Sequence, residues 1–214
     1  MTNRLALLAA ALMGVHASPA LAQDAIRILP PPPPPPVAPM DAAAEAEPVE
    51  QLVHVRLSTE MGDIVLALDE GRAPITVANF LAYLDKGWLD GQPFYRAMPF
   101  GEGGLIQGGV RDGSKLLPPI AHEASADTGL KHERGSISMA NAGPGTAQND
   151  FFIMLSPVES FDASFAPFGH VVEGMEVVEA IFKAPVDPEA GEGAMKGQMI
   201  AKPVAIVSAV RIED

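Results

Sequence analysis

Short hydrophobic runs alternate with turn residues from about residue 51 to the end of the chain. Residues 53–57 alternate apolar and polar side chains, which is the period of a half-buried strand. A turn over residues 60–63 and a second apolar run over residues 64–68 complete a predicted β-hairpin. Gly- and Pro-rich loops separate six further predicted strands, at residues 94–98, 106–110, 137–141, 151–155, 168–172 and 204–212.

Two segments have instead the 3.6-residue period of a helix. The first begins at Pro74 and ends by Gly87, and the second spans residues 175–182 before Pro185. Many short strands with two helices predict a mainly β domain, either closed or sandwich-like. The side chains expected to face the core are Ile75, Ala78, Leu81 and Leu84 in the first helix, and Met175, Val178 and Ile181 or Phe182 in the second.

The first 22 residues have the three parts of a secretory signal peptide. Arg4 gives a basic start, an apolar stretch covers residues 5–15, and the small-x-small pattern of residues 20–22 precedes Gln23. An apolar run of about 11 residues is too short to cross a bilayer, which takes roughly 20. We therefore expect a signal peptide over residues 1–22 and a periplasmic mature protein without membrane insertion. The alternative is a short membrane anchor.

Residues 23–50 are rich in Ala, Pro and Glu and include an unbroken proline run over residues 30–36. Consecutive prolines cannot join a sheet or continue a helix, so we expect a disordered linker that acts as a polyproline II spacer. A docking motif for a proline-binding partner and a ligand for the domain's own groove are the alternatives. The globular domain is then expected over residues 51–214.

Composition narrows the possible partners. The formal net charge is −13, which argues against a nucleic-acid partner because phosphate binding needs clustered Lys and Arg. The chain has no cysteine, which excludes disulfides, thiolate nucleophiles and Cys-ligated zinc. His122 with Glu123, and His132 with Glu133, resemble the start of a zinc-protease motif, but neither pair is followed by a second His at the required spacing. We expect no metal and no other cofactor.

Five strings in the globular part carry more specific information. They are FYRAMP at residues 94–99, LIQGG at 105–109, GSISMANAGP at 135–144, NDFFI at 149–153 and FGHVVEGM at 168–175. In this order and at nearly this spacing, they resemble the signature segments of the cyclophilin family. Residues 76–80 also resemble the start of that family's first helix. The resemblance extends over about residues 53–212.

The resemblance implies a fold and an activity. The fold is a closed eight-stranded antiparallel β-barrel capped by two α-helices, with a peptide groove on the outside. The activity is peptidyl-prolyl cis-trans isomerisation in proline-containing exported polypeptides, by a monomer that needs no metal, nucleotide or covalent intermediate. The main alternative is a non-catalytic proline-peptide-binding or chaperone module on the same fold, and the second is an envelope scaffold held by the Pro-rich tail.

Arg96 is the residue expected to be catalytic. An X-Pro bond resists rotation because amide resonance imposes a barrier of ~18–20 kcal/mol. In the twisted transition state the nitrogen lone pair leaves conjugation, so a donor aimed at the nitrogen binds that state better than the planar ground state. A guanidinium stays protonated and offers a rigid fork of N–H groups, which suits this task. The alternative for Arg96 is a solvated surface charge.

The resemblance also implies an apolar slot for the proline ring, although each Phe or Met taken singly is as well explained by core packing. The expected substrate-binding residues are Phe152 and Met139 lining the slot, Leu105 at its edge, Phe161 and Phe165 at its far wall, and Gln107 with the backbone of Ala140 and Asn141 holding the peptide.

The chain departs from the family pattern around this slot. The loop between Arg96 and Gln107 is longer than in well-known members, and Gly104 stands where the family usually has Phe. Phe100 is a candidate to fold back into the place of that missing side chain. The Trp that many members use to grip cyclosporin is absent, and Phe165 replaces a His of the groove wall. We expect weak cyclosporin binding and retained catalysis.

Overall fold

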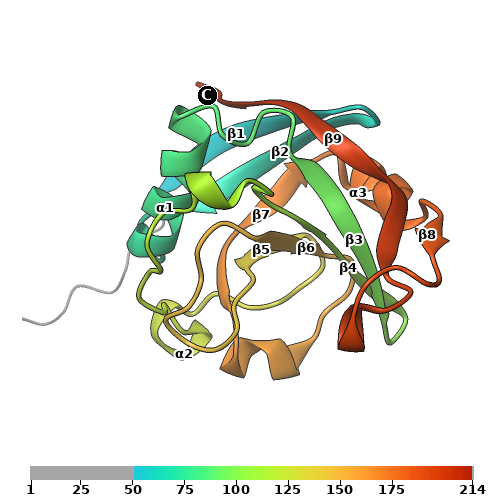
Figure 1. Ribbon diagram of the computed structural model, residues 1–214. Coiled ribbons are helices and arrows are strands. Elements are labelled where there is room, and N and C mark those ends of the chain that lie inside the picture. The colour runs from blue at the N-terminus through green and yellow to red at the C-terminus, as the bar shows by residue number, and fades with distance from the viewer. Residues whose placement is uncertain (1–50, 214) are drawn as a thin grey trace, which may run out of the picture. The chain divides into compact units, whose positions relative to one another are not determined.

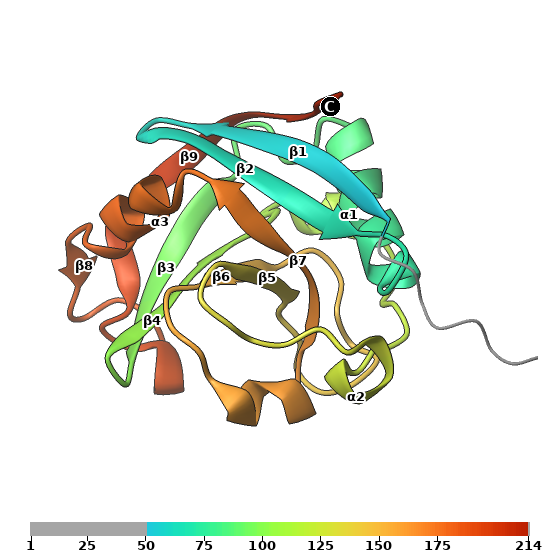
Figure 2. The same ribbon diagram turned by 180° about the vertical axis from the view of Figure 1, so that it is seen from behind.

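The computed structural model describes residues 51–213, so the predicted signal peptide (1–22) and linker (23–50) lie outside the described residues. Within residues 51–213, antiparallel strands form one sheet in the order β1-β2-β7-β5-β6-β4-β3-β9-β8. Pairing of β1 with β9 closes eight of these strands into a barrel, and the two-residue β8 adds to the edge of β9 (Figures 1 and 2). The predicted closed barrel is confirmed. The strands are β1 (Leu52–Thr59), β2 (Gly62–Asp69), β3 (Pro93–Phe100), β4 (Gly103–Gly108), β5 (Ser136–Met139), β6 (Phe151–Met154), β7 (Ala166–Glu173), β8 (Val186–Asp187) and β9 (Met199–Arg211).

The β1–β2 hairpin shows how the sequence pattern sets the strands. Val55 and Leu57 point into the barrel and are fully buried, whereas Arg56 between them is exposed. The hairpin turns tightly, with Thr59 opposite Gly62, and Gly62 has a φ of +131° that favours glycine. In contrast to β1, β2 is apolar on both faces, because helix α3 (Met175–Phe182) packs against it.

Three α-helices accompany the barrel in the described part of the chain, one more than predicted. Helix α1 (Pro74–Asp85) and α3 lie on opposite sides of the barrel in both views (Figures 1 and 2). The additional helix, α2 (Ser125–Thr128), is a single turn that ends at Gly129 with a φ of +73°. Four residues are too few to produce a periodic apolar pattern, so α2 could not be predicted from the amino-acid sequence.

The buried face of α1 differs from the predicted face. Ile75 is 45% exposed and Ala78 is also exposed, so their inward placement was wrong. This helix has two overlapping rows of apolar side chains. The row that contains the large Phe80 ring faces the barrel, and the row that begins with Ile75 and Ala78 does not. Phe80 packs edge-on against Phe151, with ring centroids 5.3 Å apart, on the inward face of the helix. The buried apolar residues of α1 are Val77, Phe80, Leu81, Tyr83 and Leu84.

The inward face of α3 matches the prediction in part. Val178 and Ile181 are fully buried, and Met175 and Phe182 are half-buried. Val177 is buried as well, which the prediction missed. None of the helices that the structure describes is long and apolar enough to cross a membrane.

The start of α1 is capped from a distant loop. Its own N-cap residue, Ala73, has no side-chain oxygen to offer the free N–H groups of the first turn. The carboxylate of Glu123 takes that place, because it accepts from Ile75 N (3.0 Å), Thr76 N (2.7 Å) and Thr76 Oγ1 (2.6 Å). This contact ties the long loop after β4 to the helix.

The barrel separates two apolar clusters. The large one fills the interior, and the small one lies on the outer side of β4 and β6, where Leu105, Phe152, Met154 and Val158 form its buried part. Strand alternation produces this division, since Phe151 and Ile153 face inward while Phe152 between them faces outward. The fold therefore places an apolar patch outside the core, where a ligand can reach it.

Candidate active site

The outer cluster borders a groove of about 240 Å³. Strands β3, β4 and β6 supply one part of its lining, and loops after β5, β6 and β8 supply the rest. Most of its apolar lining side chains are buried or half-buried, Met195 is exposed, and the polar lining residues are the buried Gln107 with the half-buried Arg96 and Asn141. An apolar lining with a few polar groups is the usual construction of a small ligand site. The lining residues are Arg96, Met98, Leu105, Gln107, Ala140, Asn141, Phe152, Phe161, Phe165 and Met195.

Three aromatic rings shape the apolar end of the groove. Phe152 meets Phe165 at a centroid distance of 5.2 Å and Phe161 at 6.0 Å, with both pairs nearly perpendicular. Phe161 and Phe165 are 5.1 Å apart. Edge-to-face packing of this kind holds rings in fixed positions. The result is a preformed slot for a small apolar ring.

A β-bulge brings Arg96 to this groove. The register of β3 against β4 shifts between Phe94 and Arg96, so that Phe94 and Ala97 both point into the core. The two residues between them, Tyr95 and Arg96, both face outward as a consequence. Simple alternation from Phe94 would have turned Arg96 toward the barrel interior.

Neutral acceptors hold the Arg96 guanidinium at the rim. Nε and Nη2 donate to Gln198 Oε1 at 2.9 and 2.6 Å, Nη1 donates to Gln107 Oε1 at 2.9 Å, and Nη2 lies 3.1 Å from the Met98 sulfur. No carboxylate of residues 51–213 forms an ion pair with Arg96. Burial lowers the pKa of Arg96 from its ordinary value, and the group remains a cation at neutral pH. The charge is therefore oriented but not neutralised.

Gln107 is oriented by groups behind it. Its Nε2 donates to Tyr95 Oη at 2.6 Å and to Asp150 Oδ2 at 3.2 Å, while Tyr95 Oη donates to the same carboxylate oxygen at 2.5 Å. Because Nε2 is engaged there, Oε1 is the atom that faces Arg96. Burial raises the pKa of Tyr95, and the Asp150 charge raises it further, so the phenol stays protonated as a donor.

A second pocket of about 260 Å³ continues the groove. It shares Gln107, Ala140, Asn141 and Met195 with the first, and the rest of its lining is mostly polar. The two pockets together therefore form one longer groove with an apolar end and a more polar end.

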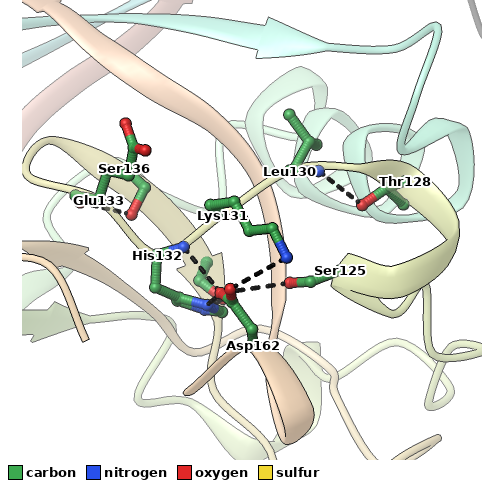
Figure 3. A network of polar contacts seen from close by, with 9 residues as sticks. Ser125, Thr128, Leu130, Lys131, His132, Glu133, Ser136 and Asp162 are labelled. Atoms are coloured by element: carbon green, nitrogen blue, oxygen red, sulfur yellow. Dashed lines mark hydrogen bonds and ion pairs between the residues drawn. The ribbon is translucent and has the colours of Figure 1, made fainter. Parts of the chain in front are cut away.

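A buried histidine supports the aromatic slot from behind. The His132 side chain is fully buried and stacks on Phe152, with centroids 6.0 Å apart and planes 17° apart. Its Nδ1 lies 2.7 Å from Asp162 Oδ1 and its Nε2 lies 2.9 Å from Ser138 Oγ. Figure 3 shows how Lys131, His132 and Ser125 converge on the Asp162 carboxylate. Both ring nitrogens are thus satisfied within the fold.

The charges in this network favour a neutral imidazole beside an ionised carboxylate. Burial lowers the pKa of His132, and the Asp162 contact only partly offsets that effect. Burial acts to raise the pKa of Asp162, but hydrogen bonds from His132 and Lys131 outweigh it and lower that pKa overall. Nδ1–H therefore donates to Asp162, and Nε2 accepts from the Ser138 hydroxyl.

Comparison with known proteins identifies the family. Residues 54–210 match the sequence profile of the cyclophilin type peptidyl-prolyl cis-trans isomerases. The chain belongs to this family. It is similar to peptidyl-prolyl cis-trans isomerase A of Dickeya dadantii, with 38% identity over 138 residues that cover 60% of this chain and 70% of the relative. It is also similar to a peptidyl-prolyl cis-trans isomerase of Acinetobacter baylyi, with 32% identity over 164 residues that cover 72% and 82% of the two chains.

Solved cyclophilin structures have the same fold. The crystal structure of a cyclophilin type isomerase of Cryptosporidium parvum superposes with a TM-score of 0.65 at 25% identity, covering 77% of this chain and 99% of the other. A second structure of that protein, in the presence of the dipeptide Ala-Pro, superposes with a TM-score of 0.64 at 25% identity, covering 75% and 99%.

The structure brings together most of the residues that the cyclophilin resemblance implied. Arg96 and seven of the eight expected substrate-binding residues line one groove. Met139 is the exception and does not line it. On β5, Met139 pairs with Phe151 and points into the barrel interior, where it is 1% exposed. Ser138, the residue before it, faces the groove side and reaches His132, so the prediction for Met139 was wrong by one position of the strand alternation.

The departures from the cyclophilin pattern have structural explanations. Gly104 has a φ of +150°, and a Cβ there would come within 2.2 Å of the Met98 carbonyl oxygen, so no larger residue fits this backbone. The side chain of Met98 lines the groove instead. Phe100 folds back as proposed, with its ring 5.9 Å from Phe161, but it is 48% exposed and outside the groove lining.

Several functional contacts of this cyclophilin escaped the sequence reasoning. Met98 lies two residues after Arg96 in the FYRAMP segment, so strand alternation from Arg96 would have placed it on the same face. Met195 and Gln198 come from a Gly-rich loop with no periodic signal, about a hundred residues from Arg96 in sequence. The stacking of His132 on Phe152 joins two segments that are separate in the sequence.

One residue of each His-Glu pair has a role in the fold. Glu123 caps α1, and His132 supports the slot. Within residues 51–213, no three His, Asp or Glu side chains converge in a way that could hold a metal ion.

Proposed function

We propose that this chain catalyses cis-trans isomerisation of X-Pro bonds, with Arg96 as the catalytic residue. One observation carries the proposal: an unneutralised guanidinium, oriented by amide oxygens, stands at the rim of an aromatic slot on the outside of the barrel. A pure peptide-binding module has no need of a fixed cation at that point.

The groove provides binding for the substrate. The proline ring enters the slot formed by Phe152, Phe161 and Phe165, where burial of its methylenes contributes about 0.8 kcal/mol each. Ala140 and Asn141 line the groove, and their backbone groups are the ones expected to pair with the extended peptide. Binding the ring fixes one side of the bond while the preceding residue rotates.

Arg96 provides the interaction that is specific to the transition state. A guanidinium has five N–H groups, of which Gln198 engages two and Gln107 one. A fourth faces the Met98 sulfur, which is a weak acceptor. The fifth, on Nη1, has no partner among residues 51–213. These last two groups are available to the prolyl carbonyl and to the nitrogen once it is twisted out of plane.

The energy required is within reach of such a site. Lowering the barrier from ~18–20 to ~13 kcal/mol would give on the order of 10³ turnovers per second. Reducing the barrier by about 6 kcal/mol is plausible for a preorganised cation in a partly desolvated groove that also selects a twisted conformation. No acid, base or nucleophile is required, because no bond is broken.

The test is a protease-coupled assay of cis X-Pro peptides with purified protein. Arg96→Ala should lower kcat/KM by about 100- to 1000-fold, the usual effect of removing one preorganised donor. Arg96→Lys keeps the charge but loses the fork, so it should restore only a small part of the activity. Negligible acceleration by the unaltered protein, or full activity in folded Arg96→Ala, would leave the non-catalytic binding or chaperone function in its place.

We further propose that the protein acts as a monomer on exported polypeptides in the periplasm, with residues 23–50 as a spacer. The signal-like pattern of residues 1–22 supports export. Mass spectrometry of the protein recovered from a periplasmic fraction should give an N-terminus at Gln23. An intact N-terminus in the membrane fraction would support an anchor instead.

A further inference from the structure

The segment between α3 and β9 reaches the groove from the far end of the chain. It contains β8 and the short 3-10 helix Gly193–Met195, and it ends at Gln198. Met195 lines both pockets of the groove, and Gln198 makes two of the hydrogen bonds to Arg96. Figure 1 shows this segment beside the β3–β4 hairpin. It is therefore a wall of the groove and not a remote connection.

Gln198 is held on three sides. Its backbone N donates to Met195 O at 3.1 Å, its backbone O accepts from Ala97 N at 2.9 Å, and its side-chain Nε2 donates to Ala194 O at 2.8 Å. Ala97 directly follows Arg96 on β3, so one backbone hydrogen bond joins the two segments next to the catalytic side chain. The position of Gln198 relative to Arg96 is fixed by these contacts.

The chemistry of the neighbours determines which end of the amide faces Arg96. A backbone carbonyl can only accept, so Nε2 must face Ala194. A guanidinium can only donate, so Oε1 must face Arg96, where it accepts from Nε and Nη2 together. Rotating the amide by 180° would set donors against donors on one side and oxygen against oxygen on the other.

We propose that Gln198 is a positioning residue for the catalytic Arg96. Its single oxygen takes the Nε edge of the guanidinium, and Gln107 takes Nη1, so the plane of the group is fixed from two sides. An amide does this without cancelling the charge, which a carboxylate in its place would do. This inference rests on the proposed isomerase function and adds a residue that acts through Arg96.

The test compares Gln198→Met with the unaltered full-length protein. Methionine has nearly the same length and volume but no strong acceptor, so the variant removes the hydrogen bonds with little change in packing. We expect kcat to fall about 10- to 100-fold with KM nearly unchanged, the size of loss caused by misplacing a reacting group. Lys196→Met is the matched control, because Lys196 is exposed on the same segment and pairs with Glu189 instead.

A nuclear magnetic resonance measurement gives a readout independent of activity. The Nε–H resonance of Arg96 should be protected from exchange in the unaltered protein and lost in Gln198→Met. Gln198→Glu should retain it, because a carboxylate oxygen accepts from the same N–H groups. A fall in kcat together with loss of this resonance supports the inference.

Three outcomes would overturn it: unchanged kcat in Gln198→Met, a change confined to KM, or an equal loss in Lys196→Met. Each of these is distinct from failure of the proposed function, in which the unaltered protein itself would not accelerate isomerisation.

Discussion

Neighbouring residues on one strand of this protein have different roles, because one packs in the core and the next lines the groove. On β6, Phe151 packs in the barrel core against Phe80 and Phe94, while Phe152 forms the slot outside. The same division holds on β4, where Ile106 faces inward and Gln107 outward. At the scale of single residues, the function depends on which side of the pleat a side chain takes.

The two adjacent phenylalanines provide a matched pair of variants. Phe152→Leu should reduce kcat/KM by about tenfold or more, since it removes one wall of the slot. Phe151→Leu should instead lower the free energy of unfolding by about 1–3 kcal/mol without changing kcat/KM of the folded protein. Denaturant unfolding and the coupled peptide assay on both variants check this. Wild-type kinetics in folded Phe152→Leu would remove Phe152 from the pocket.

The elements of the barrel are held in place by contacts from distant loops. Helix α1 lacks a capping side chain of its own and receives the Glu123 carboxylate from 47 residues away. The negative charge also lies at the positive end of the helix dipole. A loop between β4 and β5 thereby fixes a helix that precedes both strands in the chain.

Removal of this cap should destabilise the protein. Glu123→Ala should lower the free energy of unfolding by about 0.5–2 kcal/mol, the usual cost of losing a helix cap. Glu133→Ala, the equivalent change in the other His-Glu pair, should have little effect because that side chain is exposed. Urea unfolding measures both, and equal losses in the two variants would contradict the capping role.

At the scale of the whole molecule, barrel closure joins the core to the site. The interior cluster and the groove share strands β3, β4 and β6, so the core fixes the strands from which the groove side chains project. His132 extends this coupling, because it is buried between Asp162 on one side and the aromatic slot on the other. Protonation of His132 should therefore lower the free energy of unfolding of the whole domain.

Acid should destabilise the protein through His132. Its folded-state pKa is lowered, so below about pH 6.5 the unfolded chain binds a proton that the folded chain does not. The free energy of unfolding should accordingly fall as the pH drops below about 6.5, until the lowered folded-state pKa is passed. His132→Asn cannot titrate and should show a smaller pH dependence in this range.

The control for this prediction is His170→Asn, which changes an exposed histidine on β7. It should leave the pH dependence as it is in the unaltered protein. Thermal or urea unfolding at a series of pH values gives the comparison. An unchanged slope in His132→Asn would contradict a buried neutral imidazole.

The strand-rich class and the two longer helices could be predicted from the amino-acid sequence alone, and the motifs that resemble the cyclophilin family indicated eight residues that line the groove. These features depend on the hydrophobic periodicity, on the turn residues and on short motifs, all of which can be identified in the sequence without a structure. The misplacement of Met139 shows the limit, because resemblance locates a segment more reliably than it assigns the face of each side chain.

The orientation of those segments and the contacts around them are defined only in the folded barrel. The Glu123 cap and the Gln198 contact join residues that are far apart in the sequence. The bulge at Arg96 depends on the pairing of β3 with β4, and the rotation of α1 depends on which of its two apolar faces packs better against the barrel. Their free energies arise from contacts that exist only once the barrel has closed, so no local pattern in the chain encodes them.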